Sequence, residues 1–293
     1  MYDIRGYYEA ETVREATELL GANPKLKIIA GGTDVLVKMH GGQLEDAELL
    51  SIRKIQELRD IRKLENGTIA IGPMAAFTNV FNDQIMKKHV PILTEAAISM
   101  GGPQIRNIAT IGGNVCNGAT SADSASSLFA LNAHLKLQNL QGERVIPIQE
   151  FYLGPGKVDL KPGEVLTDIL IYPEDYQGFG GQYIKFAMRE AMDIATLGVA
   201  VLCKLDSGNF SEIRIGLGVA GPTPLRCVEA EDFARGKKIS PETIEEISKL
   251  AVKSAKARTS WRASKEYREH LVEELTQRAL QTAIVRAGGV DLV

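Results

Sequence analysis

Two glycine pairs with polar neighbours constrain the fold of this chain more than any other feature. The first is in residues 30–34 (AGGTD), directly after the apolar run 27–30, and the second is in residues 110–114 (TIGGN), roughly eighty residues later. Glycines let the backbone approach a ligand closely and adopt positive φ, so that successive N–H groups can meet one anion. The two segments therefore predict turns suited to a diphosphate that is bound without a metal ion.

Each segment taken alone is a weak signal, because most Gly-Gly-Thr sequences are plain turns. Thr33 adds a hydroxyl donor, and residues 35–39 could begin a helix whose N-terminus favours negative charge. Asp123 lies nine positions after the second segment. It could either cap a helix that runs to Leu131 or accept a hydrogen bond from a ribose hydroxyl, and the spacing leaves both roles open.

Other nucleotide-binding motifs are missing from the sequence. No GxGxxG follows a strand, which argues against a Rossmann site, and the absence of GxxxxGK[ST] excludes a P-loop ATPase. Residues 216–218 (GLG) lie on an expected strand without a following helix. We therefore interpret these glycines as packing residues.

Charge and the scarcity of metal ligands narrow the functional classes. The net charge is −3, whereas a nucleic-acid binder normally carries a basic excess. The three cysteines and four histidines are scattered, without CxxC or HxH pairs, so any metal chemistry is expected on another chain. No apolar run approaches the length of about eighteen residues that spans a membrane. The N-terminus does not resemble a signal peptide, so we expect a cytoplasmic protein.

Periodicity and turn signals predict the remaining elements. Thr12 and Glu15 form a capping box for a helix that Gly21 ends. A helix over 78–100 is expected to break near Pro91. Further predicted elements are hairpins at 64–71 and 135–148, strands at 183–189, 194–205 and 210–219, and helices at 241–256 and 260–287. Strands followed by helices indicate a separate α+β domain, which we place after about residue 176.

Three segments are characteristic of a known family: residues 103–114 (PQIRNIATIGGN), 185–189 (KFAMR, with DIA at 193–195) and 260–268 (SWRASKEYR). Essentially the whole chain resembles the FAD-carrying flavoproteins of the molybdenum hydroxylases, which include xanthine dehydrogenase and carbon monoxide dehydrogenase. The resemblance implies an α+β fold. A vanillyl-alcohol-oxidase-type (PCMH-type) FAD-binding domain of two α/β subdomains would span residues 1–176. A smaller α+β domain, an antiparallel sheet with helices, would span residues 177–293.

Residues 116–123 (CNGATSAD) and 154–157 (GPGK) are most similar to the stand-alone FAD subunits of bacterial xanthine dehydrogenases. This subgroup implies a heterotrimer in purine metabolism. A large molybdopterin subunit would hydroxylate the substrate, and a small subunit would pass electrons through its [2Fe-2S] clusters. FAD on this chain would collect them and reduce NAD.

Other functions stay open at this point. One is the flavoprotein of a related molybdenum hydroxylase that acts on nicotinate, an aldehyde or another N-heterocycle. A second is a self-sufficient FAD oxidoreductase of the same fold, and a third is a scaffold with a degenerate FAD fold. Intact glycines in both segments argue against the third.

The resemblance also implies which residues contact FAD, and it assigns no catalytic residue and no metal ligand to this chain. The two glycine segments would bind the pyrophosphate, Asp123 the ribityl or ribose region, and Leu166 the adenine or the ring system. Lys185 would lie near the isoalloxazine ring, although a solvated strand edge is the alternative. Asp193 and Ile194 would approach the flavin face at which NAD reacts. The full set is Lys27, Ile28, Ile29, Ala30, Gly31, Gly32, Thr33, Asp34, Val35, Met100, Ala109, Thr110, Ile111, Gly112, Gly113, Asn114, Asp123, Val165, Leu166, Lys185, Asp193 and Ile194.

Overall fold

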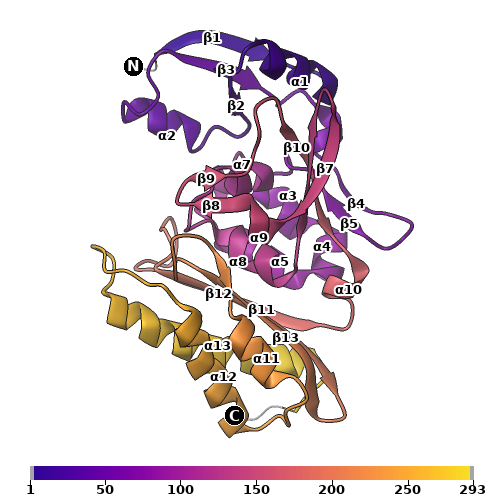
Figure 1. The fold of residues 1–293 in the computed structure, drawn as a ribbon, viewed down its shortest axis with the longest axis vertical. Coiled ribbons are helices and arrows are strands. Elements are labelled where there is room, and N and C mark those ends of the chain that lie inside the picture. The colour runs from indigo at the N-terminus through magenta and orange to yellow at the C-terminus, as the bar shows by residue number, and fades with distance from the viewer. Residues whose placement is uncertain (1–2, 291–293) are drawn as a thin grey trace.

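The computed structural model describes residues 3–290, which form three tiers along the long axis of the molecule (Figure 1). The N-terminal tier is a small sheet with its own helices. The middle tier combines most of the short helices with a longer sheet. The C-terminal tier is a sheet covered by three helices.

The N-terminal tier is built on parallel strands in the order β1-β3-β2. Its elements are β1 (Ile4–Glu9), α1 (Val13–Ala22), β2 (Lys27–Ile29), α2 (Val35–His40) and β3 (Ala47–Ser51). The predicted capping box is confirmed at α1, where the Thr12 hydroxyl accepts from Glu15 N at 3.1 Å. The Glu15 carboxylate accepts from Glu11 N at 2.8 Å. A strand at 27–29 therefore leads directly into the first glycine segment.

The middle tier contains a five-stranded antiparallel sheet in the order β4-β5-β10-β6-β7. Its strands are β4 (Ile61–Lys63), β5 (Ile69–Ile71), β6 (His134–Asn139), β7 (Gly142–Pro147) and β10 (Val165–Ile171). Around them lie η1 (Gln56–Leu58), α3 (Phe77–Asn82), α4 (Gln84–His89), α5 (Pro91–Ser99), α6 (Pro103–Arg106), α7 (Ile111–Cys116), α8 (Asp123–Ala130), α9 (Ile148–Phe151), α10 (Pro173–Tyr176) and a small hairpin of β8 (Tyr152–Gly154) with β9 (Lys157–Val158).

The helix predicted over residues 78–100 is three helices. Pro91 begins α5, as a proline at the first helical position can. Asp83 ends α3 and caps α4, because its carboxylate accepts from Met86 N at 3.0 Å. The predicted break at Pro91 is confirmed, and the second break at Asp83 was missed.

The C-terminal tier is a four-stranded antiparallel sheet in the order β11-β12-β13-β14. Its elements are β11 (Gly180–Phe186), β12 (Leu197–Asp206), β13 (Asn209–Gly218), β14 (Leu225–Arg226), α11 (Val228–Ala234), α12 (Pro241–Ser254) and α13 (Lys265–Arg286). The predicted strands and helices are confirmed with shifted ends. The last helix begins at Lys265 rather than 260, because Ser264 caps it by accepting from Tyr267 N.

Helix α8 joins the middle tier to the C-terminal sheet. All of its residues are buried, and its small Ser and Ala side chains allow close contact on both sides. A Cβ atom at Gly216 on β13 would lie 2.2 Å from the main-chain oxygen of Ser126 on α8. Gly216 is therefore a packing residue, as its sequence context predicted.

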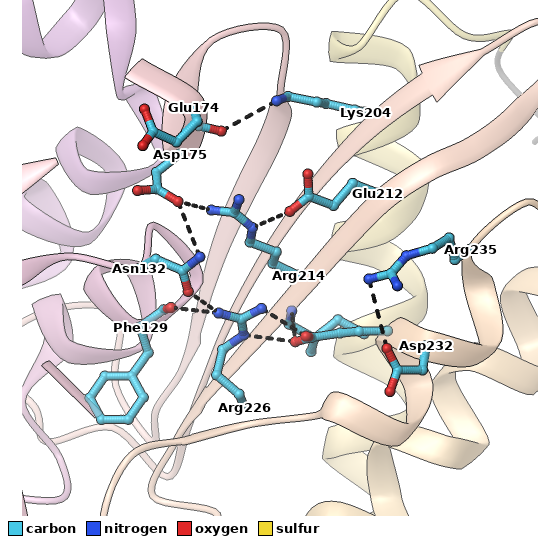
Figure 2. A network of polar contacts seen from close by, with 12 residues as sticks. Phe129, Asn132, Glu174, Asp175, Lys204, Glu212, Arg214, Arg226, Asp232 and Arg235 are labelled. Atoms are coloured by element: carbon cyan, nitrogen blue, oxygen red, sulfur yellow. Dashed lines mark hydrogen bonds and ion pairs between the residues drawn. The ribbon is translucent and has the colours of Figure 1, made fainter. Parts of the chain in front are cut away.

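A network of buried ion pairs also crosses between these two tiers (Figure 2). Arg214 on β13 donates to Asp175 on α10 at 2.8 Å, and Asn132 donates to the same carboxylate at 3.1 Å. Arg226 on β14 donates to the main-chain oxygen of Phe129 at 3.1 Å and also contacts Asn132. The C-terminal sheet is thus fixed to the middle tier by charge as well as by packing.

Candidate cofactor site

A cavity of about 570 Å³ is lined by residues of both the N-terminal and the middle tiers. Both glycine segments contribute to its wall, the first from the β2–α2 turn and the second from α7. The residues predicted from sequence that line it are Lys27, Ile28, Ala30, Gly31, Gly32, Thr33, Asp34, Val35, Met100, Ala109, Thr110, Gly112, Gly113, Asn114, Val165 and Leu166. Segments far apart in the sequence therefore share one cavity.

The first glycine segment offers a run of unused main-chain donors. Within residues 3–290, the N–H groups of residues 31–35 donate to no protein acceptor. Gly32 has a φ of +81°, which a residue with a side chain adopts only at a cost. Consecutive unsatisfied N–H groups at the wall of a cavity are a site for an anion, and the start of α2 adds to that preference.

Gly31 is needed for close packing of the main chain. Its φ is not positive, but a Cβ atom there would lie 2.1 Å from the main-chain oxygen of Ile108. Only glycine allows the first segment to pack this closely on the residues that precede the second. Gly31 is therefore required for close packing and not for positive φ.

The second glycine segment does not repeat the arrangement of the first. It forms the first turn of α7, where Ile111 N donates to Ala75 O at 3.0 Å and Gly112 N to Pro73 O at 2.9 Å. Gly113 N donates to the Thr110 hydroxyl at 3.2 Å. The main-chain donors expected to bind a ligand here are already used within the protein.

Side chains supply the donors of the second segment instead. The Ser124 hydroxyl donates to Asn114 Oδ1 at 2.6 Å, which fixes the orientation of that amide. Asn114 Nδ2 has no acceptor in the part of the chain that the structure describes, and Asn114 lines the cavity. The Thr110 hydroxyl can donate from the same wall. The two segments therefore offer main-chain donors on one side and side-chain donors on the other.

Three lysines, Lys27, Lys38 and Lys161, line the cavity together with two carboxylates, Asp34 and Glu164, of which Glu164 is neutralised by Arg144. Lys38 on α2 donates to Asn117 Oδ1 at 2.6 Å at the end of α7, so it also ties the two walls together. A diphosphate in this cavity would meet favourable charge.

An arginine clamp that the sequence did not reveal holds the loop at residues 159–164 against the cavity. Arg144 on β7 donates to Glu164 at 2.7 and 2.9 Å and to Asp159 at 2.8 Å. Lys161 N donates to Glu164 at 2.7 Å. The two carboxylates raise the pKa of Arg144. Val165 and Leu166 follow directly and are buried, so the clamp sets their position on the cavity wall.

Asp123 and Lys185 form a buried ion pair beside the cavity. Lys185 Nζ donates to Asp123 Oδ2 at 2.9 Å and to Ser99 O at 3.1 Å, and both side chains are less than one tenth exposed. Ser99 precedes Met100, which lines the cavity. The solvated-edge alternative for Lys185 is wrong. A capping role for Asp123 is wrong too. Asp123 is the first residue of α8, and its carboxylate accepts no capping hydrogen bond from the helix.

Burial affects the Asp123 carboxyl more strongly than the charge of Lys185 does. Burial raises the pKa of Asp123 to about 6, although the Lys185 ammonium acts in the opposite direction. Asp123 Oδ1 is buried and has no hydrogen-bond partner within residues 3–290. Asp123 itself is not among the residues that line the cavity.

A second hollow of about 390 Å³ includes Lys185 but not Asp123 in its wall. It is lined by Ser99, Lys185, residues 186–191 and Asp193. Met192 N donates to Gly101 O at 3.3 Å, so this loop contacts the segment next to Met100. Asp193 accepts from Arg189 N at 3.0 Å, and Ile194 is half exposed. Asp193 and Ile194 thus belong to the second hollow and its loop rather than to the first cavity.

Ile29 and Ile111 are the remaining predicted residues outside the cavity lining. Ile111 is fully buried in the core of the middle tier, and Ile29 packs against Met39, Ala47 and Leu49. Ile29 lies on a strand, where successive side chains point to opposite faces, and Ile111 lies on the inner face of a helix, so both side chains point away from the cavity. Among residues 3–290, no three His, Cys, Asp or Glu side chains gather as a group that could bind a metal ion. None of the helices described is both long and apolar enough to cross a membrane.

Comparison with known families decides the identity of the chain. A family model described as the FAD binding domain in molybdopterin dehydrogenase matches residues 2–173. A second, described as the CO dehydrogenase flavoprotein C-terminal domain, matches residues 182–283. The chain belongs to the molybdenum hydroxylase flavoproteins. Membership of this family confirms the predicted α+β fold and identifies the chain as an FAD subunit.

Individual relatives match this flavoprotein over nearly its full length. The xanthine dehydrogenase FAD-binding subunit of Escherichia coli O157:H7 is 44% identical over 99% of both chains. The carbon monoxide dehydrogenase medium chain of Hydrogenophaga pseudoflava is 32% identical, over 96% of this chain and 97% of the relative. A solved structure of carbon monoxide dehydrogenase from the same organism superposes with a TM-score of 0.93 at 30% identity, covering 98% of this chain and 99% of that chain.

Proposed function

We propose that the cavity between the N-terminal and middle tiers holds one non-covalent FAD, and that this chain is the electron-transfer subunit of a xanthine dehydrogenase. Electrons would arrive from [2Fe-2S] clusters on a small partner subunit, and NAD would receive them. A large molybdopterin subunit would hydroxylate the purine, which makes the assembly a heterotrimer. FAD supplies the chemistry that joins single-electron and two-electron transfer.

The unused N–H groups of residues 31–35 carry the proposal for the cofactor. They face a cavity that three lysines help to line, and the Asn114 amide and Thr110 hydroxyl stand on the opposite wall. A pyrophosphate between the segments would satisfy donors that the folded chain leaves unpaired. Asp123 Oδ1 would accept from a sugar or ribityl hydroxyl in the same way.

Xanthine as the substrate of the assembly is supported by the degree of similarity. The xanthine dehydrogenase subunit shares 44% identity with this chain, whereas the medium subunits of carbon monoxide dehydrogenase and nicotine 6-hydroxylase share 32% and 30%. The second hollow, next to Lys185 and Met100, supports an acceptor that reaches the flavin from that side. The three unpaired cysteines fit a reducing compartment, and we place the protein in the cytoplasm.

Gly31→Ala tests the proposed cofactor cavity. The added Cβ would overlap Ile108 O and displace the donors of residues 31–35, so we expect FAD affinity to fall at least 100-fold, measured by titration of flavin fluorescence. Gly154→Ala is the matched control, because a Cβ there meets nothing within 4 Å. Far-ultraviolet circular dichroism shows whether the variant is folded. A folded Gly31→Ala chain with full FAD occupancy would overturn the assignment.

A further inference from the structure

The loop between α12 and α13 and the first turns of α13 carry a group of arginines that lack acidic partners. Arg258, Arg262 and Arg268 form no ion pair within residues 3–290. Nearby carboxylates are otherwise engaged, since Glu269 pairs with Lys265 at 3.6 Å and Glu266 occupies the first turn of α13. In a chain with a net charge of −3, this is a local positive surplus.

The positive charges of this group also act on Arg268, which is buried. It is 3% exposed, and its guanidinium donates only to neutral groups, the main-chain oxygen of Thr196 and the Ser260 hydroxyl. Burial, followed by the charges of Arg258 and Arg262, lowers the pKa of Arg268. Buried guanidinium groups normally meet a carboxylate or phosphate, so an anion from outside the chain would relieve this repulsion.

An exposed aromatic ring stands beside the arginines. Trp261 is 74% exposed, and the Arg262 guanidinium lies 4.1 Å from its ring centroid. An exposed indole next to unneutralised guanidinium groups can take a flat base together with phosphate oxygens, which accept bidentate hydrogen bonds from arginine.

The position of the group links it to the second hollow. Arg268 holds Thr196 O, Thr196 N donates to Phe186 O at 2.7 Å, and the Phe186 ring packs edge-on against Tyr267 on α13 at 6.1 Å. Phe186 also lines the hollow next to Lys185. The arginine group is therefore connected to the wall of the hollow through Thr196 and Phe186.

We propose that Arg258, Arg262 and Trp261 bind the phosphate-bearing half of a dinucleotide electron acceptor whose reactive ring enters the second hollow. The proposal rests on the proposed function, in which NAD receives the electrons. It adds the phosphate contacts and the face by which that acceptor is recognised. An acidic segment of a partner subunit is the competing occupant.

Trp261 is the single tryptophan of the chain, so its fluorescence reports on this site. The full chain, loaded with FAD, is titrated with NAD, with ADP-ribose, which lacks the nicotinamide, and with adenosine, which lacks phosphates. We expect saturable quenching by NAD and ADP-ribose and at least tenfold weaker binding of adenosine. Inorganic pyrophosphate should compete with both.

The double variant Arg258→Gln/Arg262→Gln should weaken NAD and ADP-ribose binding at least tenfold and leave FAD occupancy unchanged. In the assembled enzyme the same variant should raise KM for NAD with little change in kcat, and leave the rate with a neutral quinone acceptor unaltered. Arg278→Gln, an exposed arginine on the same helix that pairs with Glu274, is the control and should change none of these values.

Two results would overturn the proposal. One is an NAD affinity of the double variant equal to that of the wild type. The other is a Trp261 fluorescence that changes on addition of a partner subunit but not on addition of NAD or ADP-ribose. Both are distinguishable from failure of the proposed function, in which the wild-type chain would retain no FAD or the assembled enzyme would not reduce NAD.

Discussion

Asn114 and the residues at 31–35 show that two similar sequence segments can present hydrogen-bond donors to one cavity by different means. The first segment presents unused main-chain donors, whereas the second uses its own main chain to build α7 and presents a side-chain amide. Gly112 permits close contact with Pro73, since a Cβ there would lie 2.3 Å from Pro73 Cβ. Gly112 is thus required by the packing of the protein itself.

Replacing Asn114 tests the side-chain donor. Asn114→Ala removes one hydrogen bond to a charged group, worth about 1.5–3 kcal/mol, so FAD affinity should fall by roughly 10- to 100-fold. Asn114→Asp should weaken binding further, because it places a carboxylate next to the pyrophosphate. Flavin fluorescence titration gives both values. Equal affinity of Asn114→Asp and wild type would show that this side chain does not face the phosphates.

Asp123 should make the stability of the FAD-free chain depend on pH. Because burial raises its folded-state pKa from 3.8 to about 6, the folded state keeps the proton longer than the unfolded state. Its favourable contribution is complete below about pH 4 and is lost as pH rises through 6. Relative to Asp123→Asn, wild type should lose on the order of 3 kcal/mol across this interval. Urea unfolding at several pH values measures the difference, and a difference that grows in the opposite direction would contradict the pKa shift.

Most residues predicted for the cofactor site line the cavity between the two tiers. The local glycine and hydroxyl pattern marked the two glycine segments, whereas Met100, Val165 and Leu166 came only from the family resemblance. The Asp123–Lys185 pair was not predictable, since its partners are 62 positions apart and only the folded chain brings Lys185 on β11 to the start of α8. The Arg144 clamp on Glu164 and Asp159 was missed for the same reason. Nothing in the sequence around these charged residues distinguishes a buried pair from a solvated one.

Among the elements, β1 and β3 were not predicted. The side chains of β1 are exposed or half-buried along its whole length, so no alternating pattern marks it as a strand. Helix α7 was expected to be a loop, since glycine disfavours helices by about 1 kcal/mol per residue. Its contacts with Pro73 and Ala75 outweigh that preference.

The Arg214–Asp175 pair between β13 and α10 should be essential for attaching the C-terminal sheet. Both side chains are less than one tenth exposed, so Arg214→Met would leave a buried carboxylate with only Asn132 as partner. We expect a loss of about 3–5 kcal/mol in the free energy of unfolding, measured by denaturant titration.

Two further variants show whether the loss comes from the buried ion pair. Arg214→Met/Asp175→Asn should recover part of the loss, because it removes the unpaired charge. Arg278→Met breaks an exposed pair on α13 and should cost less than about 1 kcal/mol. A loss at Arg214 no larger than at Arg278 would show that the network in Figure 2 contributes little.

The whole molecule has two hollows near the Asp123–Lys185 pair: Met100, next to the Lys185 partner Ser99, lines the first, and Lys185 itself lines the second. The first lies between the N-terminal and middle tiers and is the proposed FAD cavity, and the second includes residues of β11 in its wall. The domain boundary at about residue 176 stays a prediction; it falls at the end of α10, where the chain leaves the middle tier for β11. The α+β class was predictable from strands followed by helices, whereas the parallel order of the first sheet was not.

The flavin content of the purified chain is the decisive measurement. The chain is incubated with excess FAD, desalted and examined by visible spectroscopy before and after denaturation. We predict one FAD per chain that stays bound through desalting and is released entirely on denaturation, because no covalent attachment is expected at either glycine segment. A chain that is folded yet retains no flavin, or one that keeps its flavin after denaturation, would contradict a non-covalent FAD cavity between the two segments.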